Sequence, residues 1–121
     1  MSQAVDNSIK SIYRDGSKHA LDVVLLHTPL CWEGHCTPAQ QKYPWQDAWN
    51  NLARIYKEGQ RIMAIGVSQF SYSQLNELIR LSDVRVAVVQ NWMDPFHQDR
   101  DVSLLLLLLL LSLIFVSCQF Y

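Results

Sequence analysis

The sequence predicts an α/β fold built on a parallel β-sheet. Three short aliphatic runs lie at residues 21–26, 62–67 and 86–89, and segments with helical periodicity separate them. Runs too continuous to alternate between apolar and polar residues are typical of strands buried on both faces, as in parallel sheets. The order of strands and helices therefore indicates about three consecutive βα units.

Composition limits the size of the protein and its partners. A chain of 121 residues with 50% hydrophobic residues is one domain of modest size. Its net charge of −1 provides no basic surface, so nucleic acid is not an expected partner. Three cysteines, an odd number, and the lack of an apolar leader at the N-terminus indicate a cytoplasmic protein.

The first helix is expected over residues 5–13. Val5, Ile9 and Ile12 recur there at spacings of four and three, which places them on one helical stripe. The sequence Asp-Gly-Ser at residues 15–17 is a helix stop followed by a loop. The first strand then begins at about residue 21.

Each of the three aliphatic runs ends at a polar residue. His27 follows the first run, Ser68 the second and Gln90 the third. Pro29 cannot extend a central strand, so a loop begins there. The carboxyl ends of parallel strands share one edge of the sheet, where α/β proteins build their sites. We therefore expect His27, Ser68 and Gln90 to lie together at that edge.

Two further helices are expected between the strands. Residues 28–43 form a loop, long enough to suggest a functional role, and a helix begins near Pro44 and ends before Gly59. Its apolar face consists of Trp45, Ala48, Trp49, Leu52, Ile55 and Tyr56. The next helix starts at a capping-box pattern in residues 71–74, and its apolar face consists of Leu75, Leu78 and Ile79.

The composition changes abruptly near Ser103. Residues 102–121 contain no charged residue, and residues 104–111 are eight leucines in succession. A membrane-spanning helix needs about 20 apolar residues, whereas the strongly apolar part, residues 104–116, is 13 residues long. A hydrophobic C-terminal helix is therefore expected, either as a membrane anchor or as a non-native, aggregation-prone extension.

Four segments resemble the central part of the aldo-keto reductase superfamily. They are DVVLLHTP at 22–29, WNNLARIYKEGQRIMAIG at 49–66, VSQFS at 67–71 and VVQNWMDPFHQ at 88–98. The resemblance covers residues 1–102, so residues 103–121 are expected to be a separate leucine-rich tail. It implies a TIM barrel, which needs eight strands and about 250 residues. The chain is accordingly predicted to be a partial (β/α)8 barrel.

The resemblance also implies an activity, a cofactor and roles for residues. Its members reduce aldehydes and ketones with NADPH, so NADP(H) is the implied cofactor and a small carbonyl compound the implied substrate. His27 matches the active-site histidine that orients the substrate carbonyl and assists proton transfer. Ser68 and Gln90 match contacts to the nicotinamide carboxamide. Gln69 stands where the family usually has asparagine, and its amide lies one methylene further out.

Aromatic and sulfur-containing side chains in the two predicted loops are candidates for a substrate pocket. Trp32 lies in the long loop and is a candidate contact for substrate or for the mouth of the barrel. Trp92, Met93 and Phe96 follow the third strand, where they could line an apolar pocket or remain exposed.

The resemblance implies that this chain alone is inactive. The family's catalytic aspartate, tyrosine and lysine belong upstream of the matched region, and its basic loop for the adenosine phosphate belongs downstream. None of them has a counterpart here. We therefore expect a truncated reductase, with the tail produced by a retained intron or a shifted reading frame.

Two alternative interpretations of the sequence are a zinc site and a non-enzymatic protein. Cys31, His35 and Cys36, with His97 or Asp94, could suggest zinc, but structural zinc favours two short-spaced ligand pairs and only one is present, so no metal site is predicted. The second alternative is a small non-enzymatic interaction protein, tethered to a membrane by residues 103–121.

Overall fold

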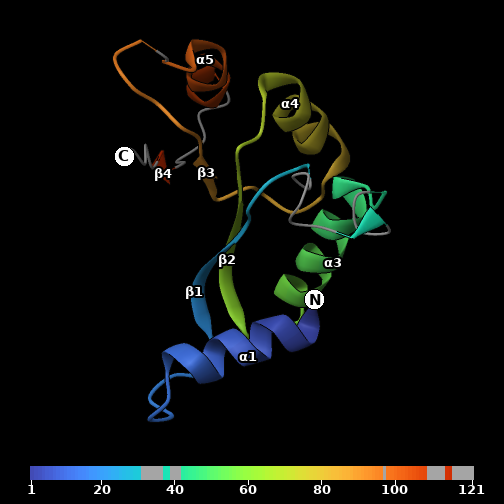
Figure 1. The fold of residues 1–121 in the computed structure, drawn as a ribbon, viewed down its shortest axis with the longest axis vertical. Coiled ribbons are helices and arrows are strands. Elements are labelled where there is room, and N and C mark those ends of the chain that lie inside the picture. The colour runs from blue at the N-terminus through green and yellow to red at the C-terminus, as the bar shows by residue number, and fades with distance from the viewer. Residues whose placement is uncertain (31–36, 39–41, 97, 109–113, 116–121) are drawn as a thin grey trace.

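The computed structural model describes residues 1–30, 37–38, 42–96, 98–108 and 114–115. Its elements in chain order are α1 (Ser2–Ile12), β1 (Leu21–Leu26), α3 (Trp45–Lys57), β2 (Ile62–Ser68), α4 (Tyr72–Leu81), β3 (Val88–Gln90), α5 (Arg100–Leu108) and β4 (Ile114–Phe115). The strands form one parallel sheet in the order β1-β2-β3-β4 (Figure 1). The predicted α/β fold with consecutive parallel βα units is confirmed. A fourth strand, β4, was not anticipated.

Strand β2 lies at the centre of the hydrophobic core. Its residues Ile65 and Val67 are almost completely buried, and they belong to one cluster with the apolar faces of α3 and α4. Figure 1 shows these two helices on the same side of the strands. The residues of α3 and α4 in this cluster are Trp49, Leu52, Ala53, Ile55, Leu75 and Leu78. Most of them were predicted, because an apolar stripe at helical spacing must face the core.

Strand β1 is less buried than the sequence indicates. Asp22 and Val23 are exposed, Val23 by 46%, and Leu21 is the strand's fully buried residue. The prediction that this strand is buried on both faces is therefore wrong. The physical reason is that β1 pairs with β2 alone within the described residues, so that it forms an edge of the sheet.

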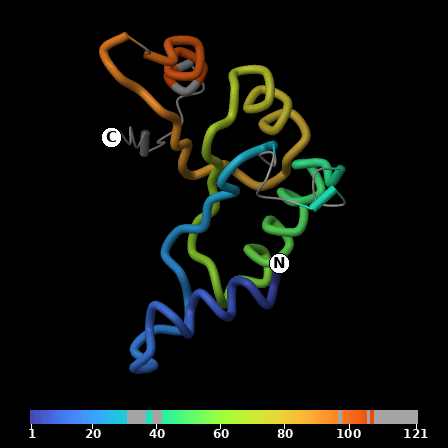
Figure 2. Tube along the Cα trace, in the orientation of Figure 1, coloured from blue at the N-terminus to red at the C-terminus, as the bar shows by residue number. Residues whose placement is uncertain are grey.

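Helix α1 lies across the amino-terminal ends of β1 and β2 (Figure 2). The Arg61 guanidinium, just before β2, holds it there by donating to Ser2 Oγ at 2.6 Å and Asp6 Oδ1 at 3.1 Å, and it also pairs with Glu58. Val5 packs into the core, whereas Ile12 is 63% exposed although the predicted stripe included it. The stripe fails at Ile12 because the helix extends past the strands that it covers (Figure 1).

The ends of α3 and α4 follow their predicted signals. Gly59, just past α3, has a φ of 74°, and its N–H donates to Tyr56 O. A residue without a Cβ adopts this left-handed conformation without strain. At α4, Ser71 Oγ accepts from the Gln74 N–H, and Gln74 Oε1 accepts from the Ser71 N–H, so the predicted capping box is confirmed.

Ser71→Ala is expected to destabilise the protein by about 1 kcal/mol, because the Gln74 N–H loses its side-chain acceptor. Urea denaturation followed by far-ultraviolet circular dichroism measures this change. Ser11→Ala in α1 is the control, since an exposed serine inside a helix is replaced there by a better helix former. An equal loss in both variants would show that the cap does not stabilise α4.

The leucine-rich segment forms two elements. Helix α5 crosses the predicted boundary at residues 102 and 103, and both Val102 and Leu105 are buried in the main core. The predicted hydrophobic helix ends at Leu108, and Ile114–Phe115 instead pairs with Val88–Val89 as β4. Aliphatic and aromatic residues favour strands where a neighbouring edge offers backbone hydrogen bonds, and β3 offers such an edge.

Among the described helices, none combines the length and the apolar character needed to cross a membrane. The rest of the predicted tail, residues 109–113 and 116–121, lies outside the described residues.

Candidate functional site

The register of the sheet brings three candidate residues to one level. Leu26 pairs with Val67, and Ser68, which follows Val67, pairs with Gln90. His27 directly follows Leu26, so it lies level with Ser68 and Gln90 at the carboxyl ends of the strands. Partners in a parallel register present their side chains to the same face of the sheet. The sheet therefore aligns Ser68 with Gln90 at its carboxyl edge, and His27 is the residue that follows β1 at the same edge.

The face that these residues share is the one that α3 and α4 leave uncovered. Ile65 and Val67 point into the core beneath the helices, and alternation along the strand turns Gly66 and Ser68 to the opposite side. Ser68 is 2% exposed, Gln90 is half-buried, and His27 is exposed. The solvent exposure of these side chains therefore increases from the buried hydroxyl of Ser68 on β2 to the exposed imidazole of His27 beyond the end of β1.

Gln69 has an unusual backbone conformation. Its φ is 57°, in the left-handed region that residues other than glycine rarely adopt. Its N–H donates to Gln90 O at 2.9 Å, so the loop after β2 is attached to the end of β3. The side chain of Gln69 is exposed. The hydrogen bond from its N–H helps to fix the backbone from which that side chain extends. Propensity in the sequence gives no signal for this conformation.

Asn91 is a site residue that the sequence analysis did not select. It follows Gln90, is 6% exposed, and donates from Nδ2 to Phe70 O at 2.7 Å and to Asp99 Oδ2. The only signal in the sequence was its place after a strand, since its acceptors come from residues far along the chain. Its Oδ1 is buried and accepts no hydrogen bond from the residues that the structure describes.

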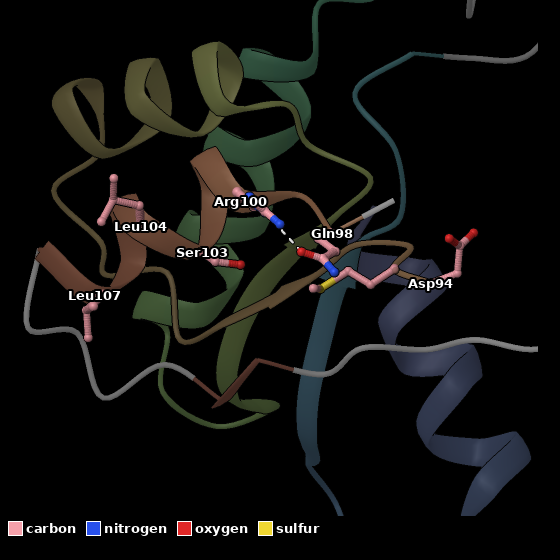
Figure 3. Close-up of a pocket in the computed structure, with 7 residues that line it drawn as sticks. Asp94, Gln98, Arg100, Ser103, Leu104 and Leu107 are labelled. Atoms are coloured by element: carbon pink, nitrogen blue, oxygen red, sulfur yellow. Dashed lines mark hydrogen bonds between the residues drawn. The ribbon is translucent and has the colours of Figure 1, made fainter. Parts of the chain in front are cut away.

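Two open cavities lie beside these strand ends. The first, of about 590 Å³, lies between the loop after β3 and helix α5. Figure 3 shows its polar floor, where Arg100 Nε donates to Gln98 Oε1 at 2.9 Å, and its apolar side, where Leu104 and Leu107 lie on α5. The second, of about 580 Å³, lies at the amino-terminal end of α4 and is lined by residues that include Gln69, Asn91 and Trp92.

Neither of these two cavities contains the whole candidate set. Gln69 lines the second, whereas His27, Ser68 and Gln90 line neither. Ser68 is buried and His27 is exposed, so these residues are identified as a candidate site by their place at the strand ends and not by a cavity.

The predicted substrate-pocket residues have mixed outcomes. Met93 lines the first cavity and Trp92 the second, whereas Phe96 is completely exposed. Phe96 lines neither cavity, and Asp94 Oδ1 accepts from its N–H at 2.7 Å in a tight turn. Trp32 and the weighed zinc ligands Cys31, His35, Cys36 and His97 lie outside the described residues.

Comparison with known proteins gives a consistent family signal. A sequence model described as "Aldo/keto reductase family" matches residues 2–110. A glyoxal reductase of Bacillus subtilis is 37% identical over 70 residues, which is 58% of this chain and 21% of the relative. An NADPH-dependent alpha-keto amide reductase of Saccharomyces cerevisiae is 28% identical over 80 residues, 66% of this chain and 24% of the relative. The chain thus spans about a quarter or less of these relatives.

Solved structures show the same fold. A Bombyx mori aldo-keto reductase crystallised in complex with NADP superposes with a TM-score of 0.73 at 17% sequence identity. The superposition covers 95% of this chain and 36% of the silkworm protein. At this identity the likeness establishes the fold alone, and the described sheet corresponds to a part of that larger protein.

Proposed function

Because the chain belongs to the aldo/keto reductase family, we propose that its strand-end polar residues form part of a carbonyl-reducing active site. The observation that carries this proposal is the alignment of His27, Ser68 and Gln90 at one level of the sheet. Three residues whose side chains can donate and accept hydrogen bonds lie at the edge where parallel α/β folds bind ligands. The complete activity belongs to a larger barrel of which these residues are a part.

The donors and acceptors at this edge fit a nicotinamide carboxamide. That group offers one acceptor oxygen and two donor hydrogens, and a serine hydroxyl and a glutamine amide can each both donate and accept. Ser68 and Gln90 are therefore proposed to bind the carboxamide, with Gln69 as a third contact. When bound, NADPH would supply the hydride for the carbonyl carbon.

His27 is proposed to act on the substrate. An imidazole at the exposed end of β1 can donate a hydrogen bond to a carbonyl oxygen, which orients the carbonyl and polarises it. A small aldehyde or ketone is the proposed substrate class. Cytoplasmic localisation is proposed with it, in keeping with the odd number of cysteines.

The cofactor contacts can be tested by nuclear magnetic resonance on the 121-residue chain. Titration with NADP⁺ is expected to shift the backbone amide signals of Ser68, Gln69 and Gln90. Gln90→Ala is expected to raise the dissociation constant for NADP⁺ at least tenfold, because it removes an amide from the carboxamide contact. Gln3→Ala, an exposed glutamine on α1 at the opposite end of the strands, should bind as the wild type does. Shifts confined to other residues, or unaltered binding by Gln90→Ala, would refute the proposed cofactor contacts.

The same chain is expected to catalyse no carbonyl reduction alone. This expectation follows from the resemblance, which implies that the family's proton-donating tyrosine and its aspartate and lysine partners belong upstream of the matched segments. During incubation with NADPH and glyoxal, the absorbance of NADPH should fall no faster than it does in a protein-free control. Sustained NADPH oxidation that depends on the chain and on glyoxal would contradict this expectation.

A further inference from the structure

We propose that Asn91 is a positioning residue that sets the backbone at Gln69. The inference rests on the proposed contact of Gln69 with the cofactor, and it deepens that proposal by naming what fixes the contact. Asn91 is 6% exposed, and it lines the second cavity together with Gln69.

The orientation of the Asn91 amide is fixed by its two acceptors. Nδ2 lies 2.7 Å from Phe70 O and 2.5 Å from Asp99 Oδ2. A backbone carbonyl and a carboxylate can only accept, so the nitrogen must face both of them. Its two hydrogens are thereby used, and Oδ1 is left in the interior. A buried acceptor without a donor is costly, so any stabilisation from this side chain comes from the two hydrogen bonds that it donates.

These hydrogen bonds hold Gln69 from both sides. On its amino side, the Gln69 N–H donates to Gln90 O, and on its carboxyl side, Phe70 O accepts from Asn91. Gln90 and Asn91 are consecutive residues at the end of β3. The left-handed φ of Gln69 is therefore fixed between two attachments to one rigid strand, which is what a strained backbone conformation needs in order to persist.

The neighbouring residues make this attachment rigid. The Phe70 side chain is completely buried, and its ring meets Trp45 edge-on at 5.2 Å. On the other side, Asp99 precedes α5, and its carbonyl accepts from the Ser103 N–H and hydroxyl. Asn91 thus joins the loop after β2 to the start of α5. Rotation at Gln69 would have to break a core contact or a strand-end hydrogen bond.

The consequence concerns the reach of the Gln69 side chain. This residue is one methylene longer than the asparagine usual in the family, so the backbone direction decides where its amide lies. A loop fixed by Asn91 sets the direction in which the Gln69 side chain leaves the backbone. Without the attachment, the same amide would sample several positions and bind the carboxamide more weakly.

Asn91→Asp is the test substitution, because it keeps the size of the side chain and replaces the donor with an acceptor. We expect amide hydrogen exchange of Gln69 to become at least tenfold faster, while exchange of Val67, which lies within β2, stays within twofold of wild type. The NADP⁺ dissociation constant should rise at least tenfold. Asn50→Asp, an exposed asparagine on α3, is the control for the added charge and should alter neither quantity.

A double variant separates the two hydrogen bonds of Asn91. In Asn91→Asp combined with Asp99→Asn, residue 99 can donate to residue 91, whereas Phe70 O still lacks a donor. Exchange at Gln69 should therefore remain fast. Should the added carboxylate unfold the protein, Asn91→Ser removes the reach to both acceptors without adding charge, and the same comparison of Gln69 with Val67 applies.

Two results would overturn the proposal. If exchange at Gln69 and Val67 accelerates equally, Asn91 stabilises the whole protein rather than the loop. If the double variant restores wild-type exchange at Gln69, the link to Asp99 and not the link to Phe70 O fixes the backbone. If the wild-type chain does not bind NADP⁺, the proposed cofactor contact fails, whereas the exchange measurements still decide the role of Asn91.

Discussion

Gly66→Ala is expected to destabilise the protein by about 3 kcal/mol, the upper part of the range for overpacking a core. A Cβ at this position would lie 2.2 Å from Val88 O and 2.8 Å from Leu25 Cδ2. The Val88 carbonyl belongs to the backbone of the neighbouring strand, so it cannot rotate away as a side chain would. Urea denaturation monitored by tryptophan fluorescence would measure the loss, since Trp49 is buried beside β2.

Gly16→Ala is the matched control for the added methyl group. No atom lies within 4 Å of a Cβ at Gly16, although its φ of 72° disfavours alanine. The expected cost there is about 1 kcal/mol, from the backbone conformation alone. A loss at Gly66 no larger than the loss at Gly16 would mean that β2 and β3 are not in close contact at this position.

Leu105→Asn is expected to destabilise the protein by about 3 kcal/mol, whereas Leu107→Asn should change stability by less than about 0.5 kcal/mol. Leu105 is 9% exposed and packs in the core, but Leu107 is 73% exposed on the same helix. The substitution is identical and both residues lie in α5, so differences in helix propensity cancel. The difference in unfolding free energy therefore measures tertiary packing.

This comparison tests whether the leucine-rich segment is part of the folded domain. Equal effects of the two substitutions would indicate that α5 does not pack on the rest of the protein, as expected for a separate tail. If Leu105→Asn fails to fold, Leu105→Ala provides a milder loss at the same position. Leu107→Asn should also reduce aggregation, because exposed leucine is replaced by a polar amide.

The elements with strong local signals were predictable. The apolar stripe of α3 identified Trp49, Leu52 and Ile55 as buried, because side chains three and four residues apart share one helical face. The capping box at Ser71 and Gln74 was equally clear, since its partners lie within one turn. The apolar stripe and the capping box both depend on residues that are close together in the chain, so the sequence alone is enough to recognise them.

The positions of the site residues were partly predictable. Polar residues at the ends of aliphatic runs identified His27, Ser68 and Gln90 as residues of one edge, and the register places them level. Their roles in binding and catalysis stay predictions. Two features had no local signal, namely the left-handed backbone of Gln69 and the contacts of Asn91. Both arise from atoms on separate loops.

Local sequence patterns were enough to predict the order of the βα units, the buried faces of their helices and the strand ends that carry polar residues. Periodicity and caps determine these features because they act over one or two helical turns. Three features depend on tertiary contacts: the exposure of β1, the formation of α5 and β4 by described residues of the leucine-rich segment, and the attachment of Gln69 to β3. Each of these depends on which backbone edge or buried donor lies nearby in space, and no local pattern specifies that neighbour.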